Sequence, residues 1–509
     1  MANQKNMVAP LQDRISQIKT EFTEPFDLKA REFKIAGKFD AVCFFVDTIA
    51  GGGRVSLEIL PSLSRLQNVT DVRDGQTTKA SNNKNQSTEK KTSESKKILD
   101  FVTKELLTIC DFAVKETFED AKNELLNGKT VMIIDGVAEY ISLDTTVFPA
   151  RGIAEPPTNS VVLGPREGFT ENLVMNIGLV RKRLKTSDLV LVNNPVGKYT
   201  STNVSVMYIK SIADQEIVDD VIKRIKSIEI DGILDSFYIM QYLQGENMNI
   251  FRQVGNSEKP DVVASKILEG RIAIFVDGSP IVLTVPYVLL EDIQAADDYY
   301  TNSSIVTLRR FIRIFGAVLA ITLPGLYIAM QLYHYNIIPL NTLFLVTNSV
   351  ENTPFSPMLE MIVVLVLFEI MYEAALRMPR HLGAATGLVA ALVLGGTAVD
   401  AGLMSAPAVL VAALSLITMY ILPSLAPQIS LLRFIFVIIG GMLGLYGIIL
   451  GGILLVIYLC SLDNFGTPML APFAPYVKGD MRDAIIMENI KDRKGRPESY
   501  SVKNKTRAK

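Results

Sequence analysis

The 509-residue sequence contains no tryptophan, only two histidines and only three cysteines. Both histidines, His334 and His381, lie beside or within the apolar C-terminal half, so the N-terminal half has neither a Ser-His-Asp triad nor a histidine-ligated metal site. The cysteines, Cys43, Cys110 and Cys460, match neither a disulfide framework nor a CxxC metal motif. The sequence therefore predicts no catalytic residues and no metal site, and it favours a reducing compartment.

Glycine motifs that bind phosphate are missing as well. Neither GxxxxGK[ST] nor GxGxxG occurs, and the cluster Gly51-Gly52-Gly53 lacks the lysine and the spacing of a phosphate loop. A flexible turn is the simpler interpretation of that cluster. We therefore expect no cofactor and no nucleic-acid partner, and we do not expect an enzyme.

Apolar residues make up 49% of the chain but are distributed unevenly. Charged residues are frequent up to Arg313, whereas residues 314–462 contain apolar runs of the ~20 residues that a helix needs to cross a bilayer. The N-terminus, Met1-Ala2-Asn3-Gln4-Lys5, is not followed by the apolar core of an export signal. The pattern predicts an integral membrane protein whose soluble N-terminal half stays in the cytoplasm.

Strand patterns occur twice in similar arrangements in the soluble half. Residues 39–46 (FDAVCFFV) form a short apolar run that is typical of a buried strand. Residues 129–134 and 137–143 flank Asp-Gly, which predicts a hairpin. Residues 271–276 and 281–285 flank Asp-Gly-Ser-Pro and predict a second hairpin.

Helical patterns alternate with these strands. Amphipathic spacing predicts helices over residues 98–126, 170–184, 216–228 and 233–243. Residues 68–97 have almost no large apolar side chains and are rich in Ser, Thr, Asn, Lys and Glu, which predicts a disordered insertion.

The predicted fold is a multidomain membrane protein with a soluble α/β half of two lobes and an all-α transmembrane domain that has re-entrant or broken helices. The expected domains are a polar N-terminal segment (1–38), a first α/β lobe (39–151), a helical connector (152–188), a second α/β lobe (189–300), a transmembrane domain (308–462) and a cytoplasmic tail (463–509).

Basic residues predict the orientation of the membrane half. Leu308-Arg309-Arg310 comes just before the first apolar helix, and the following loop as far as Glu360 has no Lys or Arg, which places the N-terminal half inside. The basic tail should also be inside, which requires an even number of crossings. Five apolar stretches are visible, namely 311–331, 359–376, 382–399, 406–422 and 431–462. Either a segment near Asp400 is re-entrant or broken, or the long last stretch crosses twice.

Carboxylates in the apolar helices are the candidate functional residues. Glu369 and Glu373 share a helix face, and Asp400 lies between two small-residue segments. One interpretation is ion passage or gating. The other is that Glu373 neutralises Arg377 one turn later and that Glu369 belongs to a packing network. For the glycines of the last stretch, close helix packing is the favoured role.

A second candidate lies in the soluble half. Arg166, Glu167, Gly168 and Phe169 stand between a strand-like run and a helix, where a basic turn could hold an anion at the helix start. The same turn could instead anchor the connector, because the basic run Arg181-Lys182-Arg183 and its nearby carboxylates can form solvated pairs. The anchoring role is the favoured one.

Several motifs, taken together, resemble a known family. The soluble half contains Arg151-Gly152-Ile153-Ala154-Glu155-Pro156-Pro157, Gly164 to Phe169 (GPREGF), Glu171-Asn172 and Asn176 to Arg183 (NIGLVRKR). The membrane half contains Glu369 to Pro379 (EIMYEAALRMP), Val399 to Leu403 (VDAGL) and Leu470 to Pro475 (LAPFAP). In these motifs the chain resembles the A subunits of GerA-type nutrient germinant receptors of spore-forming bacteria. It departs from their pattern at His381 and in its first lobe, which contains the insertion.

The resemblance implies a multi-pass protein of the spore inner membrane, embedded in lipid and with both termini cytoplasmic. It also implies an oligomer of A subunits that works with a transporter-like B subunit and a lipid-anchored C subunit, and in which nutrient sensing triggers ion release. A secondary transporter of ions or small solutes is the alternative, since broken helices suit that class too. A membrane-bound signalling enzyme lacks a recognisable catalytic constellation.

Overall fold

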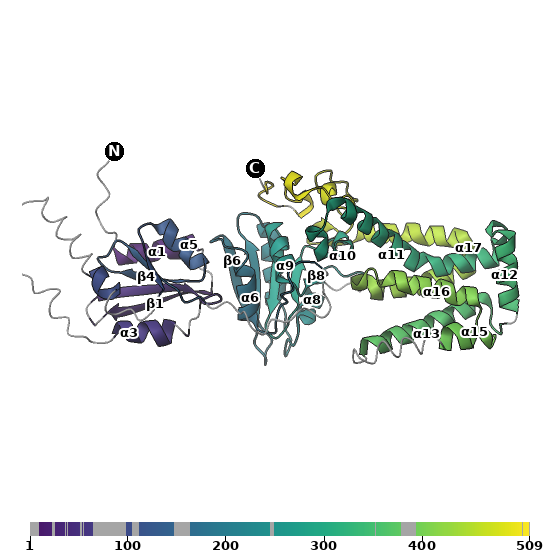
Figure 1. Cartoon of the computed structure of the whole chain (residues 1–509), viewed down its shortest axis with the longest axis horizontal. Helices are drawn as coiled ribbons and strands as arrows, with labels where there is room; N and C mark the ends of the chain where they lie inside the picture. Colours follow the sequence, from purple (N-terminus) through teal and green to yellow (C-terminus); the bar gives the residue numbers. More distant parts are fainter. Residues whose placement is uncertain are drawn as a thin grey trace, which may run out of the picture. The chain divides into compact units, whose positions relative to one another are not determined.

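The computed structural model describes residues 10–22, 26–35, 37, 39–50, 53, 55–64, 98–103, 111–146, 163–244, 249–351, 353–377, 393–500 and 502–507 (Figure 1). The chain divides into two compact units. The sheet unit comprises Met1–Glu246, Val254–Pro286 and Tyr500–Lys505, and the helical unit comprises Asn247–Gln253, Tyr287–Ser499 and Thr506–Lys509. The predicted insertion at 68–97 and the motif at 151–157 lie outside the described residues.

The first lobe of the sheet unit is built on a five-stranded antiparallel sheet. Its strands follow the spatial order β1-β2-β4-β5-β3, with β1 (Leu28–Ile35), β2 (Phe39–Val46), β3 (Phe112–Lys115), β4 (Thr130–Ile134) and β5 (Tyr140–Leu143). Its helical elements are α1 (Leu11–Glu21), η1 (Val55–Ile59), α3 (Leu60–Ser64) and α5 (Phe118–Leu126).

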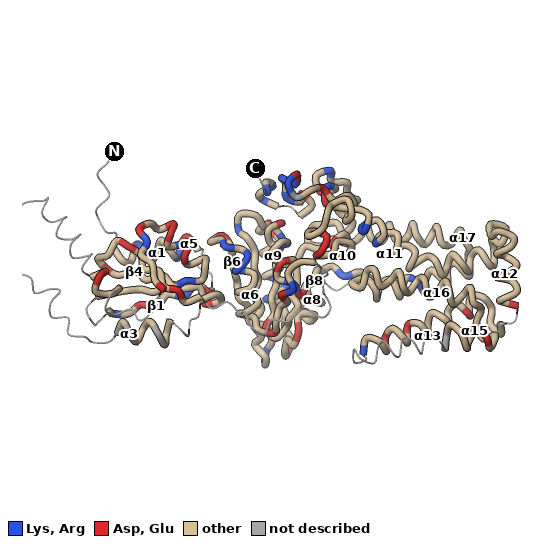
Figure 2. The backbone as a smooth tube through the Cα atoms, viewed as in Figure 1, with Lys and Arg blue, Asp and Glu red and all other residues tan. Residues whose placement is uncertain are grey.

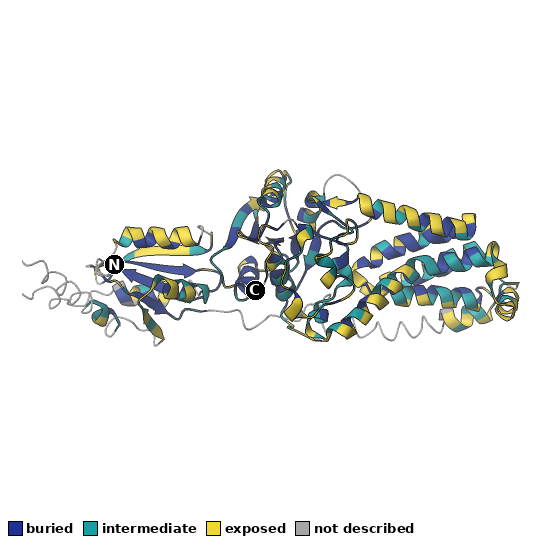
Figure 3. Ribbon diagram, turned by 90° about the horizontal axis from the view of Figure 1, so that it is seen from above, coloured by how far each residue is buried: buried dark blue, intermediate teal, exposed yellow. Residues whose placement is uncertain are grey.

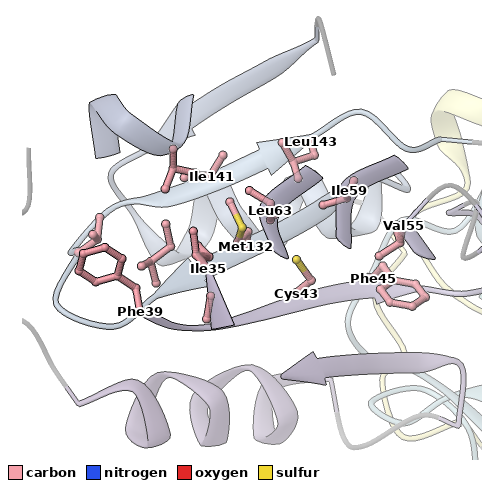
Figure 4. Close-up of a cluster of buried hydrophobic side chains, with 14 of the residues drawn as sticks. Ile35, Phe39, Cys43, Phe45, Val55, Ile59, Leu63, Met132, Ile141 and Leu143 are labelled. Atoms are coloured by element: carbon pink, nitrogen blue, oxygen red, sulfur yellow. The ribbon is translucent and has the colours of Figure 1, made fainter. Parts of the chain in front are cut away.

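Strand β2 is apolar at every position except Asp40 because both of its faces are covered. Phe44 belongs to a core cluster with Ile18 of α1, whereas Cys43 belongs to the opposite cluster with Ile59 and Leu63 of η1 and α3 (Figure 4). Alternate side chains of a strand point to opposite faces, so a strand between two helical layers needs apolar residues at nearly every position. Burial raises the pKa of the Cys43 thiol to about 12, which leaves it an unreactive core residue.

The second lobe repeats the first. Its antiparallel sheet has the order β6-β7-β9-β10-β8, with β6 (Leu189–Val196), β7 (Thr202–Ile209), β8 (Gly255–Ser257), β9 (Ile272–Val276) and β10 (Val282–Val285). Its helices are α6 (Leu173–Arg181), α7 (Gln215–Lys226), α8 (Ser236–Gln244) and α9 (Pro260–Leu268). Within each sheet the strands have the same spatial order when numbered along the chain, and each lobe begins with a helix.

Glycines in the left-handed region of φ occur at matching points of the two lobes. Gly128 (φ +89°) and Gly270 (φ +93°) follow α5 and α9, and Gly136 (φ +79°) and Gly278 (φ +86°) turn the hairpins β4–β5 and β9–β10. Glycine populates this conformation without a steric penalty. The shared strand order and the matched glycines identify the lobes as a tandem repeat.

Most predicted elements of the sheet unit are confirmed. The strand at 39–46 coincides with β2, both hairpins form, and α6, α7 and α8 occupy three of the predicted helices. The predicted helix at 98–126 is wrong. Its second half contains β3, which pairs with β5 at the sheet edge, and Thr117 then caps a separate helix, α5.

The interpretation of residues 1–38 as a polar segment ahead of the lobe is also corrected. Helix α1 packs Ile15, Ile18 and Phe22 into the core, and β1 pairs along its whole length with β2. Arg14 of α1 donates from Nη1 to the Val137 carbonyl oxygen at 2.6 Å. The apolar side chains recur at helical spacing, and the polar residues between them cover the outer face of the helix.

The helical unit contains the apolar half of the chain. Its main helices are α11 (Ser303–Leu332), α12 (Leu340–Glu351), α13 (Pro357–Arg377), α15 (Ala398–Asp400), α16 (Ala406–Met419) and α17 (Ala426–Ser461). Within the described ranges, two segments are long and apolar enough to cross a membrane, Ser303–Leu332 and Pro423–Ser461, and α16 is a shorter apolar helix. Most of the predicted stretch at 382–399 lies outside the described residues. Its described end holds a π-helical turn (Val393–Thr397) and α15.

Helix α17 turns back on itself at Gly444, where φ is +61° and ψ is −151°. A Cβ on Gly451 would lie 3.5 Å from the ring of Phe436, although a continuous helix would separate these residues by about 22 Å. A Cβ on Gly440 would likewise lie 3.0 Å from Ile448. The last apolar stretch is therefore two antiparallel arms, residues 426–443 and 445–461, which is the geometry that a double crossing of this stretch would require.

The first arm of α17 packs against α11 through glycines. A Cβ on Gly440 would lie 2.5 Å from the carbonyl oxygen of Gly325, and a Cβ on Gly325 would lie 2.4 Å from that of Phe436. Any larger residue would force the helices apart, so the backbones touch as they do in small-residue helix pairs. The packing role expected for the glycines is present at Gly440, whereas Gly452 faces open space.

A buried charge cluster holds part of the tail against the start of α11. Arg310 is fully buried; its Nε lies 3.1 Å from Asp298 Oδ2, and its Nη1 donates to Asp483 Oδ1 at 3.0 Å and to the Ala484 carbonyl oxygen at 2.6 Å. Arg313 also pairs with Asp298, at 2.7 and 2.9 Å. The start of α11 and residues 483–484 therefore lie at the same end of the helical unit.

Candidate functional site

Charged side chains are sparse on the long helices of the helical unit and frequent elsewhere (Figure 2). The arginines of α11 gather at its start, whereas α13 contains charged residues along its length, namely Glu360, Glu369, Glu373 and Arg377. Ionisable residues in an apolar bundle are costly and usually functional or paired. The candidate site is therefore built outward from α13.

Glu373 and Arg377 form the ion pair that their spacing suggests. Arg377 Nε donates to Glu373 Oε1 at 2.8 Å, and both side chains are more than half exposed. A solvated pair one turn apart contributes about 0.3–0.5 kcal/mol.

Glu369 instead reaches a different helix. Its Oε2 accepts a hydrogen bond from Nη2 of Arg433, in the first arm of α17, at 2.9 Å. Arg433 is fully buried, and its Nε and Nη1 have no hydrogen-bond partner among the described residues. A buried guanidinium held by a single carboxylate is a strained electrostatic arrangement, because its other donors have lost water without replacement.

Sequence reasoning missed Arg433, although a signal existed. Arg433 is the one charged residue in the apolar sequence from Pro423 to Ser461.

Two aromatic rings lie near Glu369, one on the same helix and one on the adjacent helix. Tyr372 of α13 and Tyr420, at the end of α16, have ring centroids 5.6 Å apart and tilted by 52°. The Glu369–Arg433 pair thus joins α13 to α17 near a contact between α13 and α16.

A buried carboxylate, Glu360, joins α13 to the start of α16. Glu360 is 1% exposed, and its Oε1 accepts the backbone N–H of Ser405, the residue that precedes α16, at 2.5 Å. The first N–H groups of a helix lack partners within the helix and favour negative charge, which accounts for this position. Glu360 and the half-buried Glu369 are about 14 Å apart along α13, so carboxylates attach the helix to its neighbours at two levels.

Asp400 is not part of this arrangement. It is exposed at the end of α15, whose Ala398 packs on the cluster formed by Met361 and Val364 in the first half of α13. The structure therefore does not gather Glu369, Glu373 and Asp400 into one site. Across the described ranges, no group of three or more His, Cys, Asp or Glu side chains is placed to hold a metal ion.

The turn at 166–169 lies in the sheet unit, where Glu167 and Phe169 are bound to neighbouring residues of the same unit. Glu167 accepts from Arg183 Nη2 at 2.5 Å, and the Phe169 N–H donates to the Glu258 carbonyl oxygen at 2.8 Å. The Phe169 ring meets Phe275 edge-on at 5.9 Å. Partial burial acts to raise the pKa of Glu167, but the hydrogen bond and charge of Arg183 outweigh it and hold that pKa below its usual range.

The start of α6 is also already capped. Asn172 Oδ1 accepts from the Met175 N–H at 3.0 Å, and Asp277 Oδ1 accepts from the Leu173 N–H at 3.2 Å. Gly168 is buried within the turn and Arg166 is exposed. These contacts are those of a connector fixed to the second lobe, and two of the N–H groups that an anion would need are in use.

Comparisons with known proteins give a consistent result. The family model described as Bacillus/Clostridium GerA spore germination protein matches residues 16–499. Spore germination protein KA of Bacillus subtilis (strain 168) is 37% identical over 77% of this chain and 73% of its own length. The uncharacterized membrane protein YfkQ of the same organism is 36% identical over 78% of each chain. Spore germination protein GerLA of Bacillus cereus is 33% identical over 79% of this chain and 82% of its own.

One solved structure is also similar. It is the crystal structure of the N-terminal domain of the A subunit of the Bacillus megaterium spore germinant receptor GerK3. It is 28% identical in sequence, covers 56% of this chain and 98% of its own, and has a TM-score of 0.38.

Proposed function

Because the chain belongs to the Bacillus/Clostridium GerA spore germination protein family, we propose that it is the A subunit of a nutrient germinant receptor in the spore inner membrane. In this proposal it is a non-enzymatic subunit that acts with a transporter-like B subunit and a lipid-anchored C subunit. Several A subunits assemble so that their helical units form or gate an ion conduit, which opens when a nutrient is sensed.

The surface of the helical unit supports a membrane position. Figure 3 shows many exposed positions along the long helices of the helical unit. On α11 and α17 these include the large apolar residues Phe311, Phe315, Leu443, Tyr446 and Ile453. A soluble monomer rarely exposes so continuous an apolar surface, so lipid or neighbouring subunits are its natural cover.

The two arms of α17 support a cytoplasmic position for both termini. Counting the arms separately gives six apolar stretches, an even number, and the tail at Asp483 meets α11 at Arg310. Arginines at this end favour the inner face of the membrane. Cysteine substituted at the exposed positions Lys34 and Lys491 should react with an impermeant maleimide only after the cells have been permeabilised. Labelling in intact cells would overturn this topology.

The observation that carries the gating proposal is the pair between the buried Arg433 and the half-buried Glu369. It joins two helices through one hydrogen bond, while two donor nitrogens of Arg433 have no partner among the described residues. Such an ion pair has two states, formed and broken. When the pair is broken, the Glu369 carboxylate is exposed to any water or cation between α13 and α17. Ion flow would then depend on whether the pair is joined.

Glu369→Gln tests this proposal, because it preserves shape and removes the charge. In liposomes that contain the A, B and C subunits, the variant should change cation flux or nutrient response several-fold while assembling normally. Glu373→Gln is the matched control, since it breaks a solvated pair on the same helix. Normal flux in Glu369→Gln, or an effect limited to loss of protein from the membrane, would rule out gating by this pair.

A secondary transporter is the second candidate. The turn at Gly444 and the π-helical turn at 393–397, close to Asp400, are interruptions of the kind that transporters use around a substrate. Flux measurements separate the two functions. Saturable exchange that is lost in Asp400→Asn would favour transport, whereas flux that rises linearly with ion concentration would favour a conduit.

A further inference from the structure

The end of the second strand forms the same turn in both lobes. After β2, the N–H groups of Ile49 and Ala50 both donate to the Val46 carbonyl oxygen, at 3.1 and 2.8 Å. Gly128 lies against this turn, where a Cβ would be 3.0 Å from the Ile49 carbonyl oxygen. Glycine at position 128 allows this close approach to the turn, and we call residues 46–50 and 128 the first socket.

The second lobe repeats this geometry after β7. The N–H groups of Ile212 and Ala213 both donate to the Ile209 carbonyl oxygen, at 3.1 and 2.9 Å. Gly270 takes the place of Gly128, and a Cβ there would be 3.3 Å from Ile212 Cγ2. Residues 209–213 and 270 therefore form a second socket of the same design.

The first socket is filled by helix α6, the opening helix of the second lobe. Gly178 of α6 lies against Thr48, next to Ile49, and Arg181 at the end of α6 pairs with the buried Asp27, with Nε 2.6 Å from Oδ2. This occupant is part of the folded lobe that follows. The turn in the first lobe is thus a docking surface for the next segment of the chain.

The second socket is filled by the C-terminal tail. Val502 is 6% exposed, and its Cγ1 would lie 2.4 Å from a Cβ on Gly270, so glycine is required beneath it. The Lys503 N–H donates to the Ile212 carbonyl oxygen at 2.9 Å. The Tyr500 ring lies under the buried guanidinium of Arg271, with Cζ 4.1 Å from the ring centroid, and its hydroxyl accepts a hydrogen bond from Arg271 Nη2.

We propose that the second socket is a peptide-docking site whose ligand is the tail segment Tyr500–Lys505. The ligand class is a short peptide. It needs an aromatic residue in the place of Tyr500, a small aliphatic residue in the place of Val502, and a backbone N–H in the place of that of Lys503. Residues 495 and 506 pair with each other and close the segment into a loop. Tyr500–Lys505 belong to the sheet unit, although the residues on either side of the segment, 499 and 506, belong to the helical unit.

The docking contacts include one backbone hydrogen bond, one buried valine, and an Arg–Tyr stack in which Arg271 also donates a hydrogen bond to the Tyr500 hydroxyl. Helix α6, in contrast, is an integral part of its lobe. In this proposal the tail can leave and re-enter the second socket, and this exchange is separate from ion conduction.

Hydrogen–deuterium exchange of the full-length protein in detergent tests the docking directly. In the unmodified chain the Lys503 amide should be protected, and Val502→Asp should speed its exchange at least tenfold and loosen residues 209–213. Lys503→Ala is the matched control, because its side chain is exposed and its backbone N–H makes the contact. An unprotected Lys503 amide, or exchange unchanged by Val502→Asp, would overturn the proposal.

A binding measurement in trans gives a second criterion. A chain that ends at Gly495 has an empty socket and should bind a fluorescent peptide of residues 497–506, whereas the full-length chain should not. The same peptide with Val502→Asp should bind the shortened chain at least tenfold more weakly. Equal binding by the two chains, or no binding by the shortened chain at millimolar peptide, would contradict a docking site.

Discussion

Tyr333, at the end of α11, closes the turn of α17 by packing against Gly444. A Cβ on Gly444 would lie 3.1 Å from the Tyr333 ring, and the Tyr333 hydroxyl donates to the Gly441 carbonyl oxygen at 2.9 Å. The turn needs a residue that accepts φ +61° and ψ −151° and that leaves room for this ring. Glycine alone meets both conditions without strain.

Gly444→Ala should therefore destabilise the helical unit by about 1–3 kcal/mol, through backbone strain and the clash with Tyr333. Thermal unfolding of the purified protein in detergent measures the effect. Gly452→Ala is the matched control, since nothing lies within 4 Å of its Cβ position and alanine favours the helix. Equal melting temperatures for the two variants would show that Gly444 is not a required turn residue.

Gly178→Ala should weaken the attachment of α6 to the first lobe. Its Cβ would lie 2.4 Å from the Thr48 carbonyl oxygen, a backbone atom that cannot rotate away, so a loss of about 1–3 kcal/mol is expected. Urea unfolding followed by circular dichroism would report it. Gly53→Ala provides the comparison, because its Cβ position is open and its effect should stay within about 0.5 kcal/mol.

The Glu369–Arg433 pair should show strong energetic coupling. Removing Glu369 leaves the buried Arg433 guanidinium unmatched and costs up to about 3–5 kcal/mol, whereas removing Arg433 leaves a carboxylate that is one-third exposed and costs less. Replacing both partners by apolar residues should also cost less than removing Glu369 alone. Melting temperatures of Glu369→Leu, Arg433→Leu and the double variant give the coupling. Additive effects would mean that the two side chains do not depend on each other.

The Glu167–Arg183 contact predicts a pH dependence. The pKa of Glu167 is lowered in the folded state, since Arg183 outweighs the effect of partial burial. The stability that it contributes is therefore present above the ordinary carboxyl pKa of about 4.3 and is lost as the pH falls through the folded pKa. Glu167→Gln should lower the melting temperature slightly at pH 7, and this difference should shrink as the pH falls through the folded pKa of Glu167. A difference that stays constant as the pH is lowered into the acid unfolding range would contradict the assignment.

Sequence patterns predicted the elements whose environment is uniform along the chain. Strand β2 is apolar at nearly every position because both of its faces are covered, and so its limits were predicted correctly. Residues 112–115 fit a helical spacing as well as a strand, and only pairing with β5, 25 to 31 residues away, decides between them. The register of a long-range pair is not visible in local periodicity.

The candidate site likewise contains one ion pair that the sequence could predict and one that it could not. The carboxylates Glu369 and Glu373 are conspicuous in an apolar helix, and the local partner Arg377 could be named from its spacing. Arg433 is 64 residues from Glu369, and nothing local connects them. Of the glycines in the last stretch, Gly444 alone turns the chain, a role that depends on how Tyr333 and the two arms pack.

The repeated lobes also have a consequence for how such arrays end. In a series of stacked repeats each member presents a surface to its successor, and the last member needs a cap. The first lobe has a successor, whose helix α6 covers its turn at Thr48. The second lobe is the final member and has none, so Val502 and its neighbours, drawn from beyond the last apolar helix, serve as the terminal cap of a two-member array.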